Sequence, residues 1–172
     1  EASEAVQIAG DLFVVVEDPG DVVARLGQRR GQPKGHRGAA RFRGPYHGGV
    51  AAAVAGVKAR GHVPFLVSIH SFTPVWRGWQ RPWHVGILWD RDEQVARAMI
   101  RGFLAQGDLV VGDNEPYHGA LEGDTLNTHG TKPGLPHALI EVRQDLIAAK
   151  TGVDEWVERV AKVIEPIMYE IR

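Results

Sequence analysis

Apolar residues along the chain gather in short β-branched runs that alternate with apolar stripes at helical spacing. The short runs predict strands at 12–16, 65–69, 85–88 and 138–142. The stripes predict helices at about 46–60, 92–106 and 154–170. Because strands and helices alternate, we expect an α/β fold of three layers, with a mixed or largely parallel sheet flanked by helices.

Proline and glycine mark where several of these elements should begin, end or bend. Pro45 suits the first turn of the first helix, and Gly61 follows its last residue. Pro166 lies inside the last apolar stripe, so we expect it to bend or split that helix. A further short strand is expected at 109–111. The polar segment from 112 to 136 is too long for a simple connection, and we interpret it as a candidate lid or binding loop.

Composition mainly excludes classes of partner and of protein. The length of 172 residues suits one domain, 1–172, with a sizeable core. A net charge of −1 gives no field that would attract nucleic acid or an anionic membrane, so we expect a small-molecule partner. No apolar run is long enough to span a bilayer, and the first residues are unlike a signal peptide, so we expect a cytoplasmic protein. The oligomeric state is left open.

Candidate chemistry begins with His70, which comes directly after the predicted strand 65–69. Ligands of open α/β sheets bind beyond the strand ends, so an imidazole there could bind a metal ion. Because the chain has no cysteine, only His, Asp and Glu side chains would complete such a site. A hydrogen-bonded, structural histidine explains the same pattern.

Further polar residues follow other predicted strands. Asn114 and Glu115 come after 109–111, and Glu141 and Arg143 lie at the end of 138–142. A sheet brings such ends together although they are far apart in the sequence. Glu141 and Arg143 alternate in a strand and share a face, which suits catalysis and anion binding but also a structural ion pair. The segment around Asn114 could equally be only a turn.

Four separated segments carry a resemblance to a known family. They are 67–74 (VSIHSFTP), 81–86 (RPWHVG), 112–117 (GDNEPY) and 135–146 (LPHALIEVRQDL). Together they resemble the N-formylglutamate amidohydrolase family, from about Phe42 to the end of the chain. The resemblance implies a phosphorylase/hydrolase-like α/β fold, related to that of zinc carboxypeptidases and aspartoacylases, and a role in histidine degradation. Four motifs in the same order are a more specific signal than any one of them.

The resemblance also implies a mechanism and a set of site residues. In such a hydrolase a zinc ion activates water and polarises the carbonyl group of an N-acyl amino acid. It implies that His70 is a zinc ligand and that Glu141 is the general base. Arg143 is then expected to bind one carboxylate of N-formylglutamate. Asn114, Arg81 and Glu115 are the further residues expected to bind substrate.

The early part of the chain departs from the family pattern. The family has Glu-His followed shortly by Asn after its first strand, whereas Glu17 is followed at once by Asp18-Pro19-Gly20. We expect Glu17 to be a second metal ligand. The sequence reads as if chain were absent at 17–18 and within 28–38, either by genuine deletion or by a break in the chain. We predict a break between the carbonyl carbon of Glu17 and the nitrogen of Asp18, and an intact bond would favour a metal-free binding protein. The basic run at 28–38 suits a solvated loop, although it could bind phosphate.

Two other functions fit the same resemblance. A metal-free relative would bind amino-acid derivatives without turnover, and a zinc carboxypeptidase-like peptidase would trim a C-terminal residue. The number of metal ligands near His70 separates the first from an amidohydrolase, and a panel of substrates separates the second.

Overall fold

The computed structural model describes the backbone of residues 5–8, 11–16 and 39–170, and side chains for 47–170. The predicted break between Glu17 and Asp18, the expected ligand Glu17 and the segment 28–38 all lie outside these residues. Within the described part, no helix is long and apolar enough to cross a membrane.

Six strands form one mixed sheet, in the spatial order β1-β2-β3-β8-β6-β7. They are β1 (Ala5–Ile8), β2 (Asp11–Val16), β3 (Phe65–Phe72), β6 (Val85–Leu88), β7 (Val111–Asp113) and β8 (His137–Arg143). The β3–β8 and β6–β7 pairs are parallel, and the other three pairs are antiparallel. The expected α/β fold is therefore confirmed, in its mixed form.

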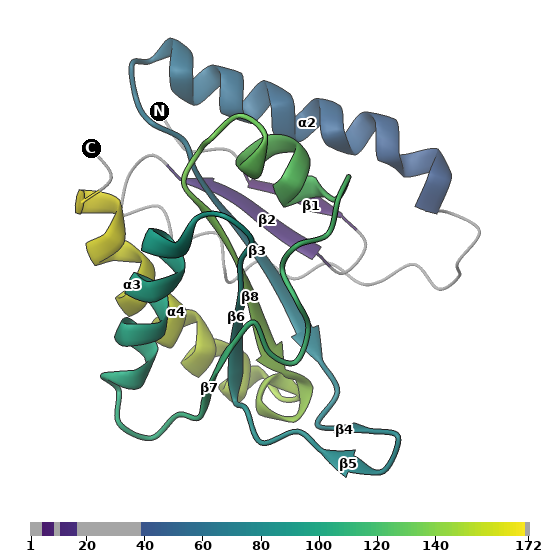
Figure 1. Ribbon diagram of the computed structural model, residues 1–172, viewed down its shortest axis with the longest axis vertical. Helices are drawn as coiled ribbons and strands as arrows, with labels where there is room; N and C mark the ends of the chain where they lie inside the picture. The colour runs from purple at the N-terminus through teal and green to yellow at the C-terminus, as the bar shows by residue number, and fades with distance from the viewer. Residues whose placement is uncertain (1–4, 9–10, 17–38, 171–172) are drawn as a thin grey trace.

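Helices cover both faces of the sheet and make the three layers (Figure 1). Helices α3 (Glu93–Leu104) and α4 (Lys150–Glu170) pack on one face, and α2 (Ala39–Ala59) lies on the other. Alternation along the strands divides their side chains between these faces. In β8, Ile140 packs with α3 and α4, whereas its neighbour Leu139 packs with α2.

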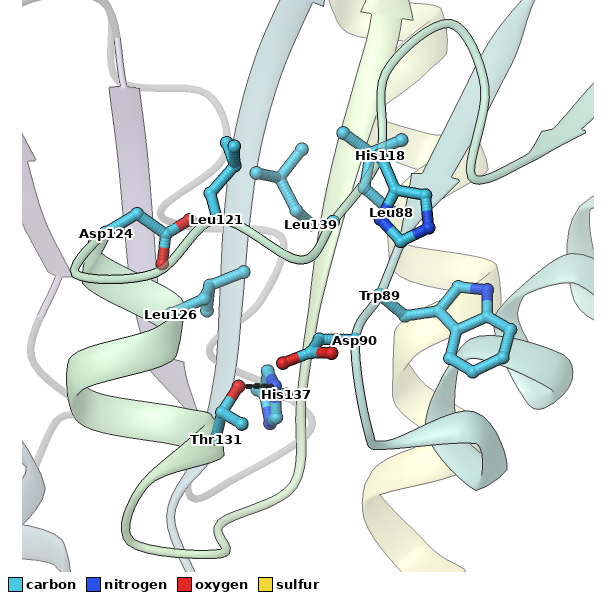
Figure 2. Close-up of a pocket in the computed structure, with 11 residues that line it drawn as sticks. Leu88, Trp89, Asp90, His118, Leu121, Asp124, Leu126, Thr131, His137 and Leu139 are labelled. Atoms are coloured by element: carbon cyan, nitrogen blue, oxygen red, sulfur yellow. Dashed lines mark hydrogen bonds between the residues drawn. The ribbon is translucent and has the colours of Figure 1, made fainter.

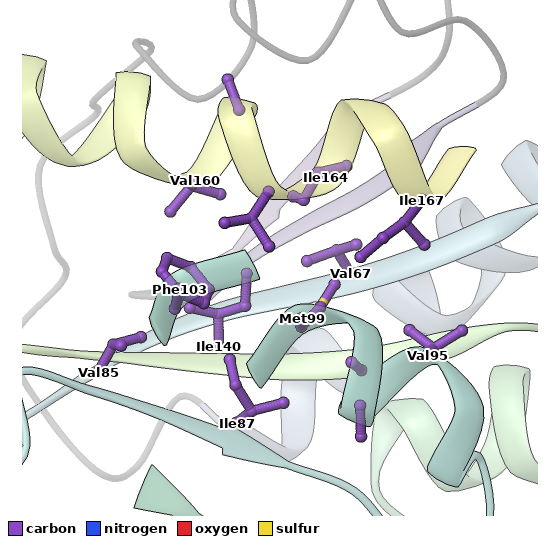
Figure 3. Close-up of a cluster of buried hydrophobic side chains, with 14 of the residues drawn as sticks. Val67, Val85, Ile87, Val95, Met99, Phe103, Ile140, Val160, Ile164 and Ile167 are labelled. Atoms are coloured by element: carbon purple, nitrogen blue, oxygen red, sulfur yellow. The ribbon is translucent and has the colours of Figure 1, made fainter. Parts of the chain in front are cut away.

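The larger hydrophobic core lies between the sheet and the α3–α4 layer (Figure 3). Met99 and Phe103 of α3 are fully buried there, together with Ile164 of α4. Gly102 lets the two helices approach closely, because a Cβ atom at that position would lie 3.0 Å from Val163. A smaller core, on the α2 face, holds Val50, Ala53, Val57, Leu66, Leu88, Leu126, Leu135 and Leu139.

Two short elements stand beside the sheet. A hairpin of β4 (Val75–Trp76) and β5 (Trp79–Gln80) extends beyond the end of β3 (Figure 1). Its turn residues Arg77 and Gly78 both have positive φ, as a two-residue type I′ turn requires. In the predicted lid segment, a π-helix at Asn127–Thr131 follows Leu126, which packs against α2.

Several predicted boundaries prove wrong. Helix α2 begins at Ala39, so Pro45 lies inside it, and α4 runs as one helix through Pro166 rather than being split there. The helix expected at 92–106 covers 93–104, and Asp92 caps it by accepting a hydrogen bond from the backbone of Val95. Strand β7 starts at Val111, so most of the strand expected at 109–111 is loop.

The correction with most consequence for function concerns β3. The strand continues three residues past its predicted end at 69, because its pairing with β8 continues to Phe72 and Arg143. His70 therefore lies within the strand and not after it. Its side-chain direction is fixed by the pleat of the sheet instead of by a loop.

Candidate active site

Three strands place His70, Glu141 and Gly86 side by side. His70 of β3 pairs with Glu141 of β8, and Glu141 pairs with Gly86 of β6. Paired residues on neighbouring strands are about 4.8 Å apart, and they point to the same side of the sheet. Leu66 of β3 and Leu139 of β8 pack against α2. His70 lies four residues after Leu66 and Glu141 lies two residues after Leu139, so both side chains point to the same α2 face. The structure thus brings together two of the predicted site residues.

The two side chains differ in exposure. Glu141 is buried, with 5% of its surface exposed, whereas His70 is half-buried. A hydrogen bond of 3.0 Å joins His70 Nε2 to the hydroxyl of Ser68, two residues earlier on the same face of β3. Because Glu141 is buried, its carboxylate would interact strongly with a charged group that binds beside it.

Gly86 and Gly112 make room for a loop that crosses this face. A Cβ atom at Gly86 would overlap the carbonyl oxygen of Glu115, and one at Gly112 would lie 2.7 Å from the same oxygen. Real side chains do not show such contacts, so both positions require glycine while the loop stays in place. The backbone of Glu115 therefore lies beside Glu141, although the side chain of Glu115 is exposed.

Asn114 fixes the shape of that loop. Its side-chain oxygen accepts hydrogen bonds from the backbone N–H of Trp89, at 2.9 Å, and of Gly119, at 3.2 Å. Its φ of 51° lies in the left-handed region, which asparagine tolerates better than most residues. The amide oxygen of Asn114 thus holds protein backbone, and its predicted contact with substrate has no observation in its favour.

Arg143 lies at the end of β8 but does not reach across to Glu141. Its guanidinium donates to both carboxylate oxygens of Asp145, at 2.8 and 3.2 Å. Its Nη1 atom lies 3.1 Å from the carbonyl oxygen of Trp83, with the carbonyls of Arg81 and Pro82 slightly further away. The hydrogen bonds from Arg143 to Asp145 lower the pKa of the Asp145 carboxyl below its ordinary value. The geometry favours Arg143 as the residue that orients segment 81–83.

Arg81 has a different environment. It is 5% exposed, and its Nη1 atom donates to the hydroxyl of Tyr117 at 3.1 Å and to the carbonyl of Thr73 at 3.3 Å. Aromatic rings surround the guanidinium, at 5.0 to 5.7 Å from its Cζ atom, and they belong to Phe72, Trp76 and Tyr117. Among the described residues, no carboxylate contacts it. Hydrogen bonds and aromatic rings compensate this buried cation, and an anionic ligand would compensate it further.

The zinc expected from the resemblance needs more ligands than the described residues bring together. A tetrahedral site with one open position needs three protein ligands. In the part of the chain that the structure describes, no group of three or more His, Asp and Glu side chains is arranged to hold a metal ion. His70 would be one ligand, and the others would have to come from residues outside that part, where Glu17 lies. The described residues alone therefore do not fit a zinc site.

A small pocket lies further along the same face, below the segment that leads into the π-helix (Figure 2). Its polar lining comes from Asp90, His118, Asp124, Thr131 and His137, and its volume of about 20 Å³ is room for one water molecule. Burial raises the pKa of the Asp124 carboxyl above its ordinary value. At the base of this pocket, His137 is hydrogen bonded at both ring nitrogens, to Thr131 and to Leu135. The pocket is too small for an amino acid.

Sequence reasoning missed the aromatic hairpin beside Arg81. Trp76 and Trp79 pair across β4 and β5, and Trp76 contacts the Arg81 guanidinium. The segment Trp-Arg-Gly-Trp at 76–79 does carry a hairpin signal, since glycine suits a two-residue turn. Tyr117 lies in a segment that the resemblance includes, but no pattern in the sequence indicates its contact with Arg81.

Comparison with known proteins gives a family match over most of the chain. The family model described as N-formylglutamate amidohydrolase matches residues 21–148. The crystal structure of a gene product from Agrobacterium tumefaciens shares 31% sequence identity, with a TM-score of 0.65 over 77% of this chain and 53% of that one. No curated protein matches the chain.

A second solved structure shows the same fold at lower identity. It is an N-formylglutamate amidohydrolase from Ralstonia eutropha JMP134, 17% identical, with a TM-score of 0.60 over 79% of this chain and 53% of that one. The chain thus spans about half the length of each of these two relatives. The family model covers well over half of the chain and includes the strands that hold His70 and Glu141. The chain belongs to the N-formylglutamate amidohydrolase family.

Proposed function

We propose that this protein hydrolyses the amide bond of N-formylglutamate or a related N-acyl amino acid, with Glu141 as the general base. The observation that carries the proposal is the position of Glu141. It is a buried carboxylate, paired with His70 across two parallel strands, in a chain that belongs to an amidohydrolase family. Family membership makes the reaction class the first hypothesis, and the site gives each residue a role.

Glu141 is suited to moving protons because its side chain is buried, away from bulk water. A formamide resists attack by neutral water, so a carboxylate must remove a proton from the attacking water. The same carboxyl group can then donate that proton to the leaving nitrogen as the C–N bond breaks. Gly86 leaves the neighbouring strand without a side chain at this point, and the loop backbone at Glu115 lies there instead.

We assign the substrate carboxylate to Arg81 rather than to Arg143. Phe72 lies two residues beyond His70 on the same face of β3, which is about 7 Å along a strand. The Arg81 guanidinium lies over the Phe72 ring, 5.7 Å from its centroid. An amino acid whose carboxylate contacts Arg81 would therefore extend its acylated nitrogen toward His70 and Glu141.

Zinc binding is a separate part of the proposal, independent of the role of Glu141. If bound, the metal would supply Lewis acidity at the scissile carbonyl group. Because the described residues bring His70 but not a complete ligand set, no proton transfer assigned here depends on the metal. Zinc content measured on the purified protein tests this part of the proposal separately.

Formate release from N-formylglutamate tests the proposed function, with zinc measured on the same samples. We expect turnover by the parent protein and loss of both zinc and turnover in His70→Ala, since a site with an open position has no ligand to spare. His62→Ala is the control, because His62 is exposed beyond the end of α2. Substrate binding without formate release would instead favour the metal-free binding protein. Release of a C-terminal residue from peptides would favour the peptidase.

A further inference from the structure

Two tryptophan side chains on the β4–β5 hairpin are exposed although they are large and apolar. Trp76 is 53% exposed and Trp79 is 56% exposed, and they face each other as a cross-strand pair. Exposed indoles that adjoin one another are unusual on a protein surface and are enriched where ligands bind. The hairpin contributes none of its side chains to either hydrophobic core, so the packing of the fold does not explain these indoles.

Contacts at the base of the hairpin hold Trp76 beside Arg81 and Trp79 against Trp83. The Trp76 ring lies 5.5 Å from the Arg81 Cζ atom, and the Trp79 ring packs edge-on against Trp83 with centroids 5.5 Å apart. The backbone N–H of Arg81 also donates to the carbonyl of Pro74 at 2.9 Å, which joins the two ends of the hairpin. A carboxylate that contacts the Arg81 guanidinium would therefore lie next to the Trp76 indole, and Trp79 is the cross-strand partner of Trp76.

The charges near the hairpin suit one carboxylate better than two. Asp145 neutralises Arg143, a half-buried guanidinium that contacts the backbone of segment 81–83. Arg77 stands at the hairpin turn, exposed, with its Cζ atom 5.7 Å from the Trp76 centroid. An exposed cation adds little to binding because water screens it. Among the described residues, a second carboxylate on the substrate would gain little, whereas an apolar side chain would be removed from water by the indoles.

We propose that the site prefers N-acyl amino acids with an aromatic or apolar side chain over those with a second carboxylate. The substrate carboxylate contacts Arg81, and the substrate side chain packs on the faces of Trp76 and Trp79. This inference rests on the proposed function for the reaction itself, but it makes a separate claim about which amino acid is held. A pocket that gains or loses an apolar contact of this size changes specificity by about tenfold.

The test compares N-formyl-L-phenylalanine with N-formyl-L-glutamate as substrates of the parent protein and of Trp76→Ala. We expect kcat/KM of the parent to favour the phenylalanine derivative by about tenfold, and Trp76→Ala to reduce that ratio by about the same factor. Trp76→Phe should restore most of the ratio. Val75→Ala is the matched control, since Val75 is on the same hairpin but neighbours Trp76 on the opposite face.

Calorimetric binding of the same two compounds to Glu141→Gln separates the two claims. If the phenylalanine derivative binds more tightly and Trp76→Ala removes this advantage, the inference about specificity holds even if no formate is released. Formate release that favours the glutamate derivative, with a ratio that Trp76→Ala leaves unchanged, overturns the inference and leaves the proposed function in place. If neither compound binds, both the inference and the proposed function are overturned.

Discussion

At the scale of single residues, Gly86 shows how closely the loop at 114–119 is packed on the sheet beside Glu141. Its φ is not in the left-handed region, so backbone strain does not explain why glycine stands there. The explanation is the carbonyl oxygen of Glu115, which lies where a Cβ atom would be. Since Glu141 is the register partner of Gly86, any movement of the loop changes the wall beside the proposed base.

Gly86→Ala should therefore destabilise the protein by about 1–3 kcal/mol, the usual cost of adding a methyl group to a filled site. Turnover should fall as well, because the loop must move away from Glu141. Urea unfolding measures the change in stability. Gly48→Ala is the matched control, since Gly48 lies in α2 with nothing within 4 Å of the added methyl group, and alanine there should be neutral or stabilising. Equal stability of the two variants would contradict the packing argument.

The ion pair of Asp145 with Arg143 predicts how the stability of the protein depends on pH. Because Arg143 lowers the pKa of the Asp145 carboxyl in the folded protein, the ionised carboxylate stabilises the fold at every pH above its ordinary pKa of about 3.9. That contribution is lost as the pH falls through the lowered pKa. Asp145→Asn should be less stable than the parent at pH 7, and the difference should shrink below about pH 4. Urea midpoints at pH 7 and pH 3 measure it; a difference independent of pH would refute the pairing.

At the scale of elements, the π-helix is held to α2 by a pair of histidines. A hydrogen bond of 2.8 Å joins His47 Nδ1 to His129 Nε2, and the two rings stack with centroids 5.1 Å apart. Burial, and to a smaller extent the His47 charge, lowers the pKa of His129 below its ordinary value. The contact therefore depends on a neutral imidazole at His129.

The contact between these two elements should weaken in acid. A histidine whose pKa is lowered by folding contributes stability that is fully present above its ordinary pKa of about 6.5 and is lost as the pH falls below that value. We expect amide hydrogens of 127–131 to exchange faster at pH 5.5 than at pH 7.5, after correction for intrinsic rates. His129→Gln keeps a hydrogen-bonding side chain that does not titrate, so it should remove this pH dependence. His118→Gln is the control, because His118 is exposed in the same segment, and this variant should keep the pH dependence.

At the scale of the whole molecule, the layers were predictable because strands and helices alternate along the chain. Leu139 and Ile140 pack on opposite faces of the sheet, which explains why the strand is a continuous apolar run in the sequence. Boundaries were less predictable, since tertiary pairing overrides local signals. His70 and Ser71 look polar enough to end a strand, yet their pairing with β8 extends β3 to Phe72.

The candidate site was predictable only in part, for a related reason. The register of β3 and β8 brings His70 beside Glu141, as expected of residues near the ends of neighbouring strands. The roles of the two arginines depend on contacts that spacing does not show. Arg143 is turned to Asp145, two residues along the chain, while Arg81 is enclosed by aromatic rings from three different segments. No pattern in the sequence distinguishes these two environments.

The most direct test of the account is the turnover of N-formylated amino acids by Glu141→Gln. The substitution keeps the shape of the side chain but removes the base, so turnover should fall by at least about two orders of magnitude while the substrate still binds. Glu158→Gln is the matched control, because that glutamate is exposed on α4. A loss of turnover in Glu141→Gln alone, with substrate affinity within a few-fold of the parent, is the result that we predict. Full turnover in Glu141→Gln would contradict the assignment of the base and, with it, the proposed mechanism.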